Sequence, residues 1–239
     1  MKKLVDGKIQ LSEIFGHNLL PNVVIKEGKS NDVSITKSNG VWRLFDKDYQ
    51  FMQLITKSNR EIKELYSSFD LAYGDVLITG LGFGILTLWV ANKPEVKSVT
   101  VIEYSQDVID LFLASNKLPD NVKVIAGNAD TYTTDKHYDC LLLDHFKDGE
   151  PKAFTYSRIQ NVAKNIPHDL FWFWSIEQRY AVRICDFTIE DLYVKPVDFK
   201  DYNFGRKWQA WIDVLDIPTI PMVAPDKIRE YVELYTNRR

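Results

Sequence analysis

A glycine-rich turn between a buried strand and a helix constrains this chain more than any other feature. The run Gly80-Leu81-Gly82-Phe83-Gly84 follows an apolar strand at 75–79 and opens a helix at 85–92. Glycines let backbone approach a ligand closely, and the helix N-terminus behind them offers free N–H groups. The next strand ends at Glu103, where a carboxylate can accept both hydroxyls of a ribose. Either feature alone also fits a purely structural role, but together they predict a nucleoside-cofactor site.

Strands and helices alternate through the middle of the chain. The predicted strands are 75–79, 98–103, 122–126, 138–144 and 170–176, and the predicted helices between them are 85–92, 106–115 and 157–165. Such alternation predicts a parallel sheet with right-handed crossovers, which is a doubly wound α/β domain. Two further strands, at 192–197 and 209–215, are expected as antiparallel neighbours.

The first part of the chain has a different pattern, with short alternating runs broken by turn residues. The Asn39-Gly40 pair between two such runs is a strong hairpin signal. We therefore expect a small antiparallel β domain over 1–46, followed by the cofactor-binding domain over 47–239. Apolar residues at mixed three- and four-residue steps predict a helix over 47–68.

Composition narrows the class of partner. A net charge of −3 gives no basic stripe for nucleic acid, and no apolar run is long enough to span a membrane. Cys140 and Cys185 lie in apolar stretches and are interpreted as reduced, buried residues, and no signal peptide is recognised, so a cytoplasmic location is expected. A small-molecule substrate is therefore favoured. Exposed edge strands of the N-terminal sheet also suggest a homodimer.

The spacing of the glycines separates possible cofactors. The dinucleotide fingerprint needs a third glycine where this chain has Ile85, which disfavours an NAD-type oxidoreductase. The run 76–84 instead resembles motif I of class I S-adenosylmethionine-dependent methyltransferases, and 101–105 and 138–144 resemble their second motif and fourth strand. The resemblance implies a Rossmann-like seven-stranded sheet. The cofactor-binding residues that it implies are Gly80, Gly82, Gly84, Glu103, Asn128, Ala129 and Asp130.

Spermidine synthases and their relatives resemble the chain most in architecture, since they also carry a small N-terminal sheet. Tyr49-Gln50-Phe51-Met52 is similar to their Y-Q-x-M element, which implies that Gln50 lies over the cofactor. These enzymes use decarboxylated S-adenosylmethionine. They place an Asp in the glycine turn, at the position where this chain has Phe83. After the fourth strand they carry a D-x-x-D pair, and the corresponding acids of this chain, Asp144 and Asp148, are separated by one residue more.

Asp144 is the best candidate for a catalytic base, because the tips of central strands face the ligand crevice, and His145 beside it could titrate near neutrality. We see no spacing typical of metal ligands. The favoured hypothesis is an S-adenosylmethionine-dependent methyltransferase that acts on a small molecule. The alternatives are a spermidine synthase-like aminopropyltransferase that uses decarboxylated S-adenosylmethionine, and a non-catalytic nucleoside-binding relative.

Overall fold

A parallel sheet forms the centre of the structure, a computed structural model that describes residues 8–10, 22–47, 51–55, 60–146, 152–176 and 220–222. Its six strands lie in the order β12-β11-β10-β7-β8-β9, and every neighbouring pair is parallel. They are β7 (Gly74–Thr79), β8 (Val96–Glu103), β9 (Val122–Ala126), β10 (Tyr138–Leu143), β11 (His168–Phe173) and β12 (Ile220–Pro221). The strands expected at 192–197 and 209–215 lie outside the described residues, so the seven-stranded sheet stays a prediction.

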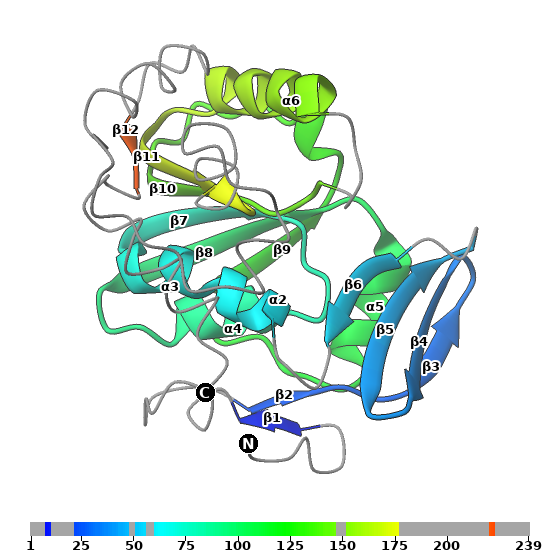
Figure 1. The fold of residues 1–239 in the computed structure, drawn as a ribbon. Coiled ribbons are helices and arrows are strands. Elements are labelled where there is room, and N and C mark those ends of the chain that lie inside the picture. Colours follow the sequence, from blue (N-terminus) through cyan, green and yellow to red (C-terminus); the bar gives the residue numbers. More distant parts are fainter. Residues whose placement is uncertain are drawn as a thin grey trace, which may run out of the picture.

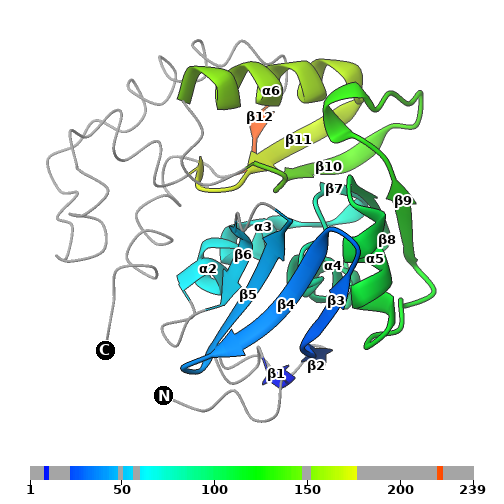
Figure 2. The ribbon, with the colours of Figure 1, turned by 90° about the vertical axis from the view of Figure 1, so that its right-hand side faces the viewer.

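Helices cover both faces of this sheet, which confirms the doubly wound prediction. Figures 1 and 2 show α6 on one face, with α4 and α5 on the other. The main helices are α4 (Ile85–Ala91), α5 (Gln106–Leu113) and α6 (Lys152–Asn165). The chain winds outward from β7 through β8 to β9, and in the other direction from β10 to β11, so the winding reverses between the neighbouring strands β7 and β10. In open α/β sheets, ligands bind at this switch point.

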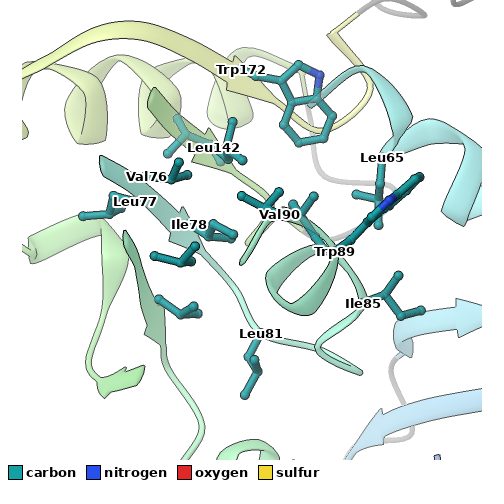
Figure 3. Close-up of a cluster of buried hydrophobic side chains, with 14 of the residues drawn as sticks. Leu65, Val76, Leu77, Ile78, Leu81, Ile85, Trp89, Val90, Leu142 and Trp172 are labelled. Atoms are coloured by element: carbon teal, nitrogen blue, oxygen red, sulfur yellow. The ribbon is translucent and has the colours of Figure 1, made fainter. Parts of the chain in front are cut away.

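The core between β7 and α4 explains why the glycine turn is held rigidly. Val76, Leu77 and Ile78 are fully buried in the middle of the sheet, as expected for a parallel strand covered on both faces. In Figure 3, Trp89 of α4 lies beside Leu65. Helix α2 (Arg60–Glu64) and helix α3 (Tyr66–Leu71) precede β7. The strand and the helix that flank the turn are therefore both fixed by packing.

A separate antiparallel sheet is formed by the N-terminal part of the chain. Its order is β3-β4-β5-β6, and a two-stranded pair, β1-β2, lies before it in the sequence. The strands are β1 (Lys8–Gln10), β2 (Asn22–Val24), β3 (Gly28–Ser30), β4 (Val33–Ser38), β5 (Val41–Asp46) and β6 (Phe51–Ile55). The hairpin predicted at Asn39-Gly40 is confirmed, and both residues have the positive φ angles, 52° and 74°, that a type I′ turn needs.

The helix predicted over 47–68 is wrong in its first part. Residues 51–55 form strand β6, which pairs antiparallel with β5, and the first helix in the described part of this range is α2. A short apolar run does not distinguish strand from helix by its periodicity. The free edge of the preceding strand β5 supplies hydrogen-bond partners that lie outside this short run, and these decide the conformation. The small sheet therefore extends past residue 46, to Ile55.

The small sheet lies beside α5, as Figure 2 shows, and polar contacts join the two. The Asp107 carboxylate accepts hydrogen bonds from the Ser30 hydroxyl at 2.6 Å, the Asn31 amide at 3.0 Å and the Asp32 N–H at 3.0 Å. Asn116 exchanges two hydrogen bonds of 2.9 Å with the backbone of Val24.

None of the helices in the described ranges is long and apolar enough to span a membrane.

Candidate functional site

Three strand tips meet at one edge of the parallel sheet. Strand β7 ends at Thr79 and leads into the glycine turn, β8 ends at Glu103, and β10 ends just before Asp144. Because β7 is hydrogen-bonded to both β8 and β10, these three groups lie next to one another at the switch point. The structure thus brings together the turn, the acid and the candidate base that the sequence singled out.

The glycine turn is shaped by close contacts as well as by backbone angle. Gly80, Gly82 and Gly84 have φ angles of 89°, 52° and 76°. A Cβ at Gly80 would overlap the main-chain oxygen of Asp144, and a Cβ at Gly82 would overlap the Gln53 side-chain oxygen. Gly84 is the N-cap residue of α4. The turn therefore has structural reasons for its glycines in addition to any ligand.

Glu103 organises the turn through its side chain. It is only 5% exposed, and its two carboxylate oxygens accept hydrogen bonds from Leu81 N–H at 2.7 Å and Ser105 N–H at 2.8 Å. An ionised carboxylate has about four lone-pair sites. Two of these are used by backbone, so the carboxylate retains capacity for two further donors. Tyr104, the next residue, is 79% exposed.

The three residues after β9 that the resemblance assigns to the cofactor, Asn128, Ala129 and Asp130, have different surroundings in the structure. Asn128 is exposed and caps the short 3₁₀ helix η1 (Ala129–Thr131), its side-chain oxygen accepting the Asp130 N–H at 2.9 Å. Ala129 is buried. The Asp130 carboxylate is instead bound by Arg158 of α6, with two bonds of 3.0 Å from Nε and a contact of 2.9 Å from Nη2.

His145 lies between the tip of β7 and this ion pair. Its Nδ1 is 2.6 Å from the Thr79 hydroxyl, and its Nε2 is 3.2 Å from Asp130 Oδ1. The hydrogen bond from His145 is the largest of the effects that lower the pKa of Asp130 to about 2, and Arg158 adds to it. Asp130 is therefore ionised throughout the physiological range.

Asp144 lies beside two acids of α2, Glu61 and Glu64. Burial, and after it the negative charge of Glu64, raises the pKa of Asp144 to about 8. Glu64 is 2% exposed, and burial also raises the pKa of Glu61 well above its ordinary value, with smaller contributions from Asp144 and Glu64. A carboxyl group in such surroundings holds its proton near neutral pH, which suits a general base or acid.

Gln53 is a site residue that the sequence did not single out. Its side-chain oxygen accepts the Phe83 N–H at 2.6 Å, and its side chain also hydrogen-bonds Glu61. Gln50, which the resemblance placed over the cofactor, lies outside the described residues, as does Asp148. The position of Gln53 depends on the pairing of β6 with β5, and the helical interpretation of 47–68 concealed it.

Replacing Gln53 with alanine is expected to lower the free energy of unfolding by about 1–2 kcal/mol, because the Phe83 N–H loses its acceptor at a partly buried position. Urea denaturation followed by circular dichroism measures this change. Met52→Ala is the matched control, since Met52 neighbours Gln53 on β6 and is 40% exposed. Equal effects of the two substitutions would show that the contact with the turn contributes nothing specific.

No group of three or more His, Cys, Asp or Glu side chains is arranged to hold a metal ion within the described ranges. Cys140 is buried in β10 as a free thiol, and burial raises its pKa to about 11. Neither observation points to metal or thiol chemistry at this edge of the sheet.

Comparison with known proteins gives similarities of structure only. No protein-family model matches the chain, and no curated protein matches its sequence. The chain is similar to the N-methyltransferase NodS from Bradyrhizobium japonicum WM9, at 20% identity over 45% of this chain and 60% of that one, with a TM-score of 0.37. It is also similar to spermidine synthase from Thermotoga maritima, at 18% identity over 60% of this chain and 53% of that one, with a TM-score of 0.42.

A third similar structure is TYW2 from M. jannaschii in complex with AdoMet, at 17% identity over 59% of this chain and 61% of that one, with a TM-score of 0.38. The chain thus spans roughly half to three fifths of the length of these proteins. Because the TM-scores are below 0.5, the reaction is inferred from the residues of the site and not from these similar structures.

Proposed function

We propose that this chain binds S-adenosylmethionine at the carboxyl edge of its parallel sheet and transfers the methyl group to a small-molecule acceptor. The observation that carries the proposal is the meeting of the glycine turn, Glu103 and Asp144 at the switch point between β7 and β10. A nucleoside cofactor needs a close backbone approach and a carboxylate for its ribose, and a transfer reaction needs an acceptor held in line with the reacting group.

The residues fit the nucleoside part of this cofactor. Glu103 keeps two lone-pair sites that can accept the ribose hydroxyls, and the exposed ring of Tyr104 beside it offers an apolar face for a purine. Because Asp130 is bound by Arg158 and His145, we assign the contact with the adenine to Asn128, which is exposed.

The turn also favours the intact cofactor over its decarboxylated form. Its N–H groups at Gly80, Leu81, Phe83 and Gly84 all have hydrogen-bond partners. Among the described residues, the Gly82 N–H has none. An anionic carboxylate is a suitable acceptor for such a backbone donor near a helix N-terminus, and S-adenosylmethionine carries one whereas decarboxylated S-adenosylmethionine does not. Phe83 is buried, lines a cavity together with Ile35 and Leu44 of the small sheet, and offers no acid for an aminopropyl group.

A cluster of three acids beside the turn, Asp144, Glu61 and Glu64, indicates the chemical class of the methyl acceptor. Asp144, Glu61 and Glu64 lie together, and among the described side chains no Lys or Arg shifts the pKa of Asp144 or Glu61. A basic acceptor such as an amine would offset the negative charge that Asp144 brings close to Glu61. A methylated amine must also lose a proton, and a carboxylate with a pKa near 8 can receive it. The same acid cluster favours aminopropyl transfer as the second candidate, because that reaction also uses an amine acceptor.

Isothermal titration calorimetry with five ligands tests the proposal. We expect S-adenosylmethionine and S-adenosylhomocysteine to bind more tightly than decarboxylated S-adenosylmethionine and methylthioadenosine, and NAD not to bind. A preference for the decarboxylated pair would establish the aminopropyl alternative. Binding of none of the five would leave a non-catalytic role.

Gly82→Arg provides the site control. The substitution is expected to abolish binding, because the new side chain occupies the space above the turn that Gln53 now contacts. The positive φ of 52° adds a strain of about 1–2 kcal/mol, which a folded domain tolerates. Thermal unfolding of the variant, measured in parallel, confirms that it is folded, and normal binding by a folded Gly82→Arg variant would place the cofactor elsewhere.

A further inference from the structure

The His145 ring joins three segments that are far apart in the sequence. It contacts Thr79 at the tip of β7 and Asp130 of η1, and Asp130 is fixed in turn by Arg158 of α6. The ring is also packed 4.2 Å from the Phe146 ring, centroid to centroid, and the side chain is only 12% exposed. His145 is therefore held from several sides rather than directed toward solvent.

The hydrogen-bond partners determine where the protons lie. Asp130 is ionised and can only accept, so His145 Nε2 carries a proton toward it. The simplest arrangement then has Nδ1 accepting the proton of the Thr79 hydroxyl. The same hydroxyl oxygen accepts the Asp144 N–H at 3.2 Å, and the Thr79 main-chain oxygen accepts it at 3.0 Å. Thr79 thus binds both the backbone of Asp144 and the ring of the next residue.

We propose that His145 is a positioning residue that anchors the segment after β10 and thereby holds the Asp144 carboxyl group in its partly buried place beside α2. Both ring nitrogens are engaged by protein groups, so the imidazole is not presented to a substrate as a general base. Asp144 and His145 have different tasks, because the side chain of Asp144 lies beside the acids of α2, whereas that of His145 binds Thr79 of β7 and Asp130 of η1.

An anchor is needed because the surroundings of Asp144 are unfavourable for a carboxylate. Among the side chains that the structure describes in α2, Glu64 acts on the Asp144 carboxyl, and Asp144 and Glu64 both act on Glu61. No hydrogen bond or ion pair to the Asp144 carboxyl is present among the described residues. Burying an acid without partners is costly, so a segment released from Thr79 and Asp130 would turn this side chain toward water.

The use of Asp144 as a base rests on the proposed function, whereas the anchoring does not. The inference therefore needs a measurement on the protein without any cofactor or acceptor. Carbon-detected NMR follows the protonation of individual aspartate side chains as a function of pH, and it reports directly where the Asp144 carboxyl titrates. A failure of anchoring and a failure of the methyl-transfer proposal are then distinguishable.

The first pair of variants is His145→Ala and His137→Ala. In the unmodified protein we expect Asp144 to titrate with a pKa near 8. In His145→Ala the pKa is expected to fall by about one unit or more toward the ordinary aspartate value. His137→Ala removes another His–Asp pair, with Asp169 at 3.0 Å, at the opposite end of β10, and it should leave the titration of Asp144 unchanged.

The second pair keeps the test decisive if His145→Ala does not fold. Thr79→Val removes the hydroxyl without adding volume and should also lower the pKa of Asp144, while Thr79→Ser keeps the hydroxyl and should preserve it. An unchanged titration of Asp144 in folded His145→Ala and Thr79→Val would overturn the anchoring role. Loss of transfer in His145→Ala with that titration unchanged would instead make His145 a participant in the chemistry.

Discussion

Replacing Glu103 with alanine is expected to weaken both the fold and the cofactor site. The free energy of unfolding should fall by about 2–4 kcal/mol, because the N–H groups of Leu81 and Ser105 lose a buried, charged acceptor. The affinity for S-adenosylmethionine should fall roughly 30- to 1,000-fold, which corresponds to the loss of about 2–4 kcal/mol of ribose contacts. Urea denaturation and calorimetry measure the two effects separately.

Glu95→Ala is the control for this prediction, since Glu95 is exposed in the turn that precedes β8. It should change neither quantity. Glu103→Gln provides an intermediate case, because the amide keeps one acceptor oxygen but presents N–H groups where the backbone also donates. A Glu103→Ala protein that binds the cofactor normally would remove Glu103 from the ribose site, whatever its effect on stability.

Replacing Asp144 with asparagine is expected to stabilise the protein at neutral and alkaline pH. With a folded-state pKa near 8 and an unfolded value of about 3.9, the folded chain keeps a proton between these limits that the unfolded chain releases. Stability therefore falls as pH rises from 4 to 8, by at most about 1.4 kcal/mol per pH unit. Because Asp144 is partly exposed, we expect a gain of about 2–4 kcal/mol for the variant at pH 8.

Denaturation curves at a series of pH values test this effect. The variant and the unmodified protein should be equally stable near pH 4 and diverge as the pH rises, and the exposed Asp120 gives the control substitution Asp120→Asn. A smaller slope should remain in Asp144→Asn, because burial also raises the pKa of Glu61. If Asp144 is the base, transfer should increase with pH through about 8 and fall by about 100-fold or more in the variant.

The strands and the helices of the parallel sheet follow from local patterns, and this explains why they could be predicted. Parallel strands that are buried on both faces have nearly continuous apolar sequences, as at 138–143. Because the connections between parallel strands are right-handed, only a few sheet topologies are compatible with a given series of strands and helices. The glycine turn and the acid that ends β8 were recognisable for the same reason. Both belong to one strand–helix–strand unit, and the carboxyl ends of its two parallel strands lie at the same edge of the sheet. Their proximity could therefore be predicted without the remainder of the fold.

The roles of individual side chains at that edge depend on contacts between distant segments. Asp130 and His145 carry typical site chemistry in the sequence, yet Arg158 and Thr79 engage them in the structure. Gln53 has no signal of its own, because its place on the glycine turn results from the pairing of β6 with β5. Residue type alone does not show which polar groups already have partners.

The sequence by itself determined the doubly wound architecture, the glycine turn and the position of Glu103 at the end of its strand, because each is encoded within a few neighbouring elements. Only the tertiary structure decided that residues 51–55 are a strand, that Gln53 contacts the turn, and that Asp144 is set against the acids of α2. Burial and charge at a site are sums over segments that are remote in sequence, and these sums exist only once the chain is folded.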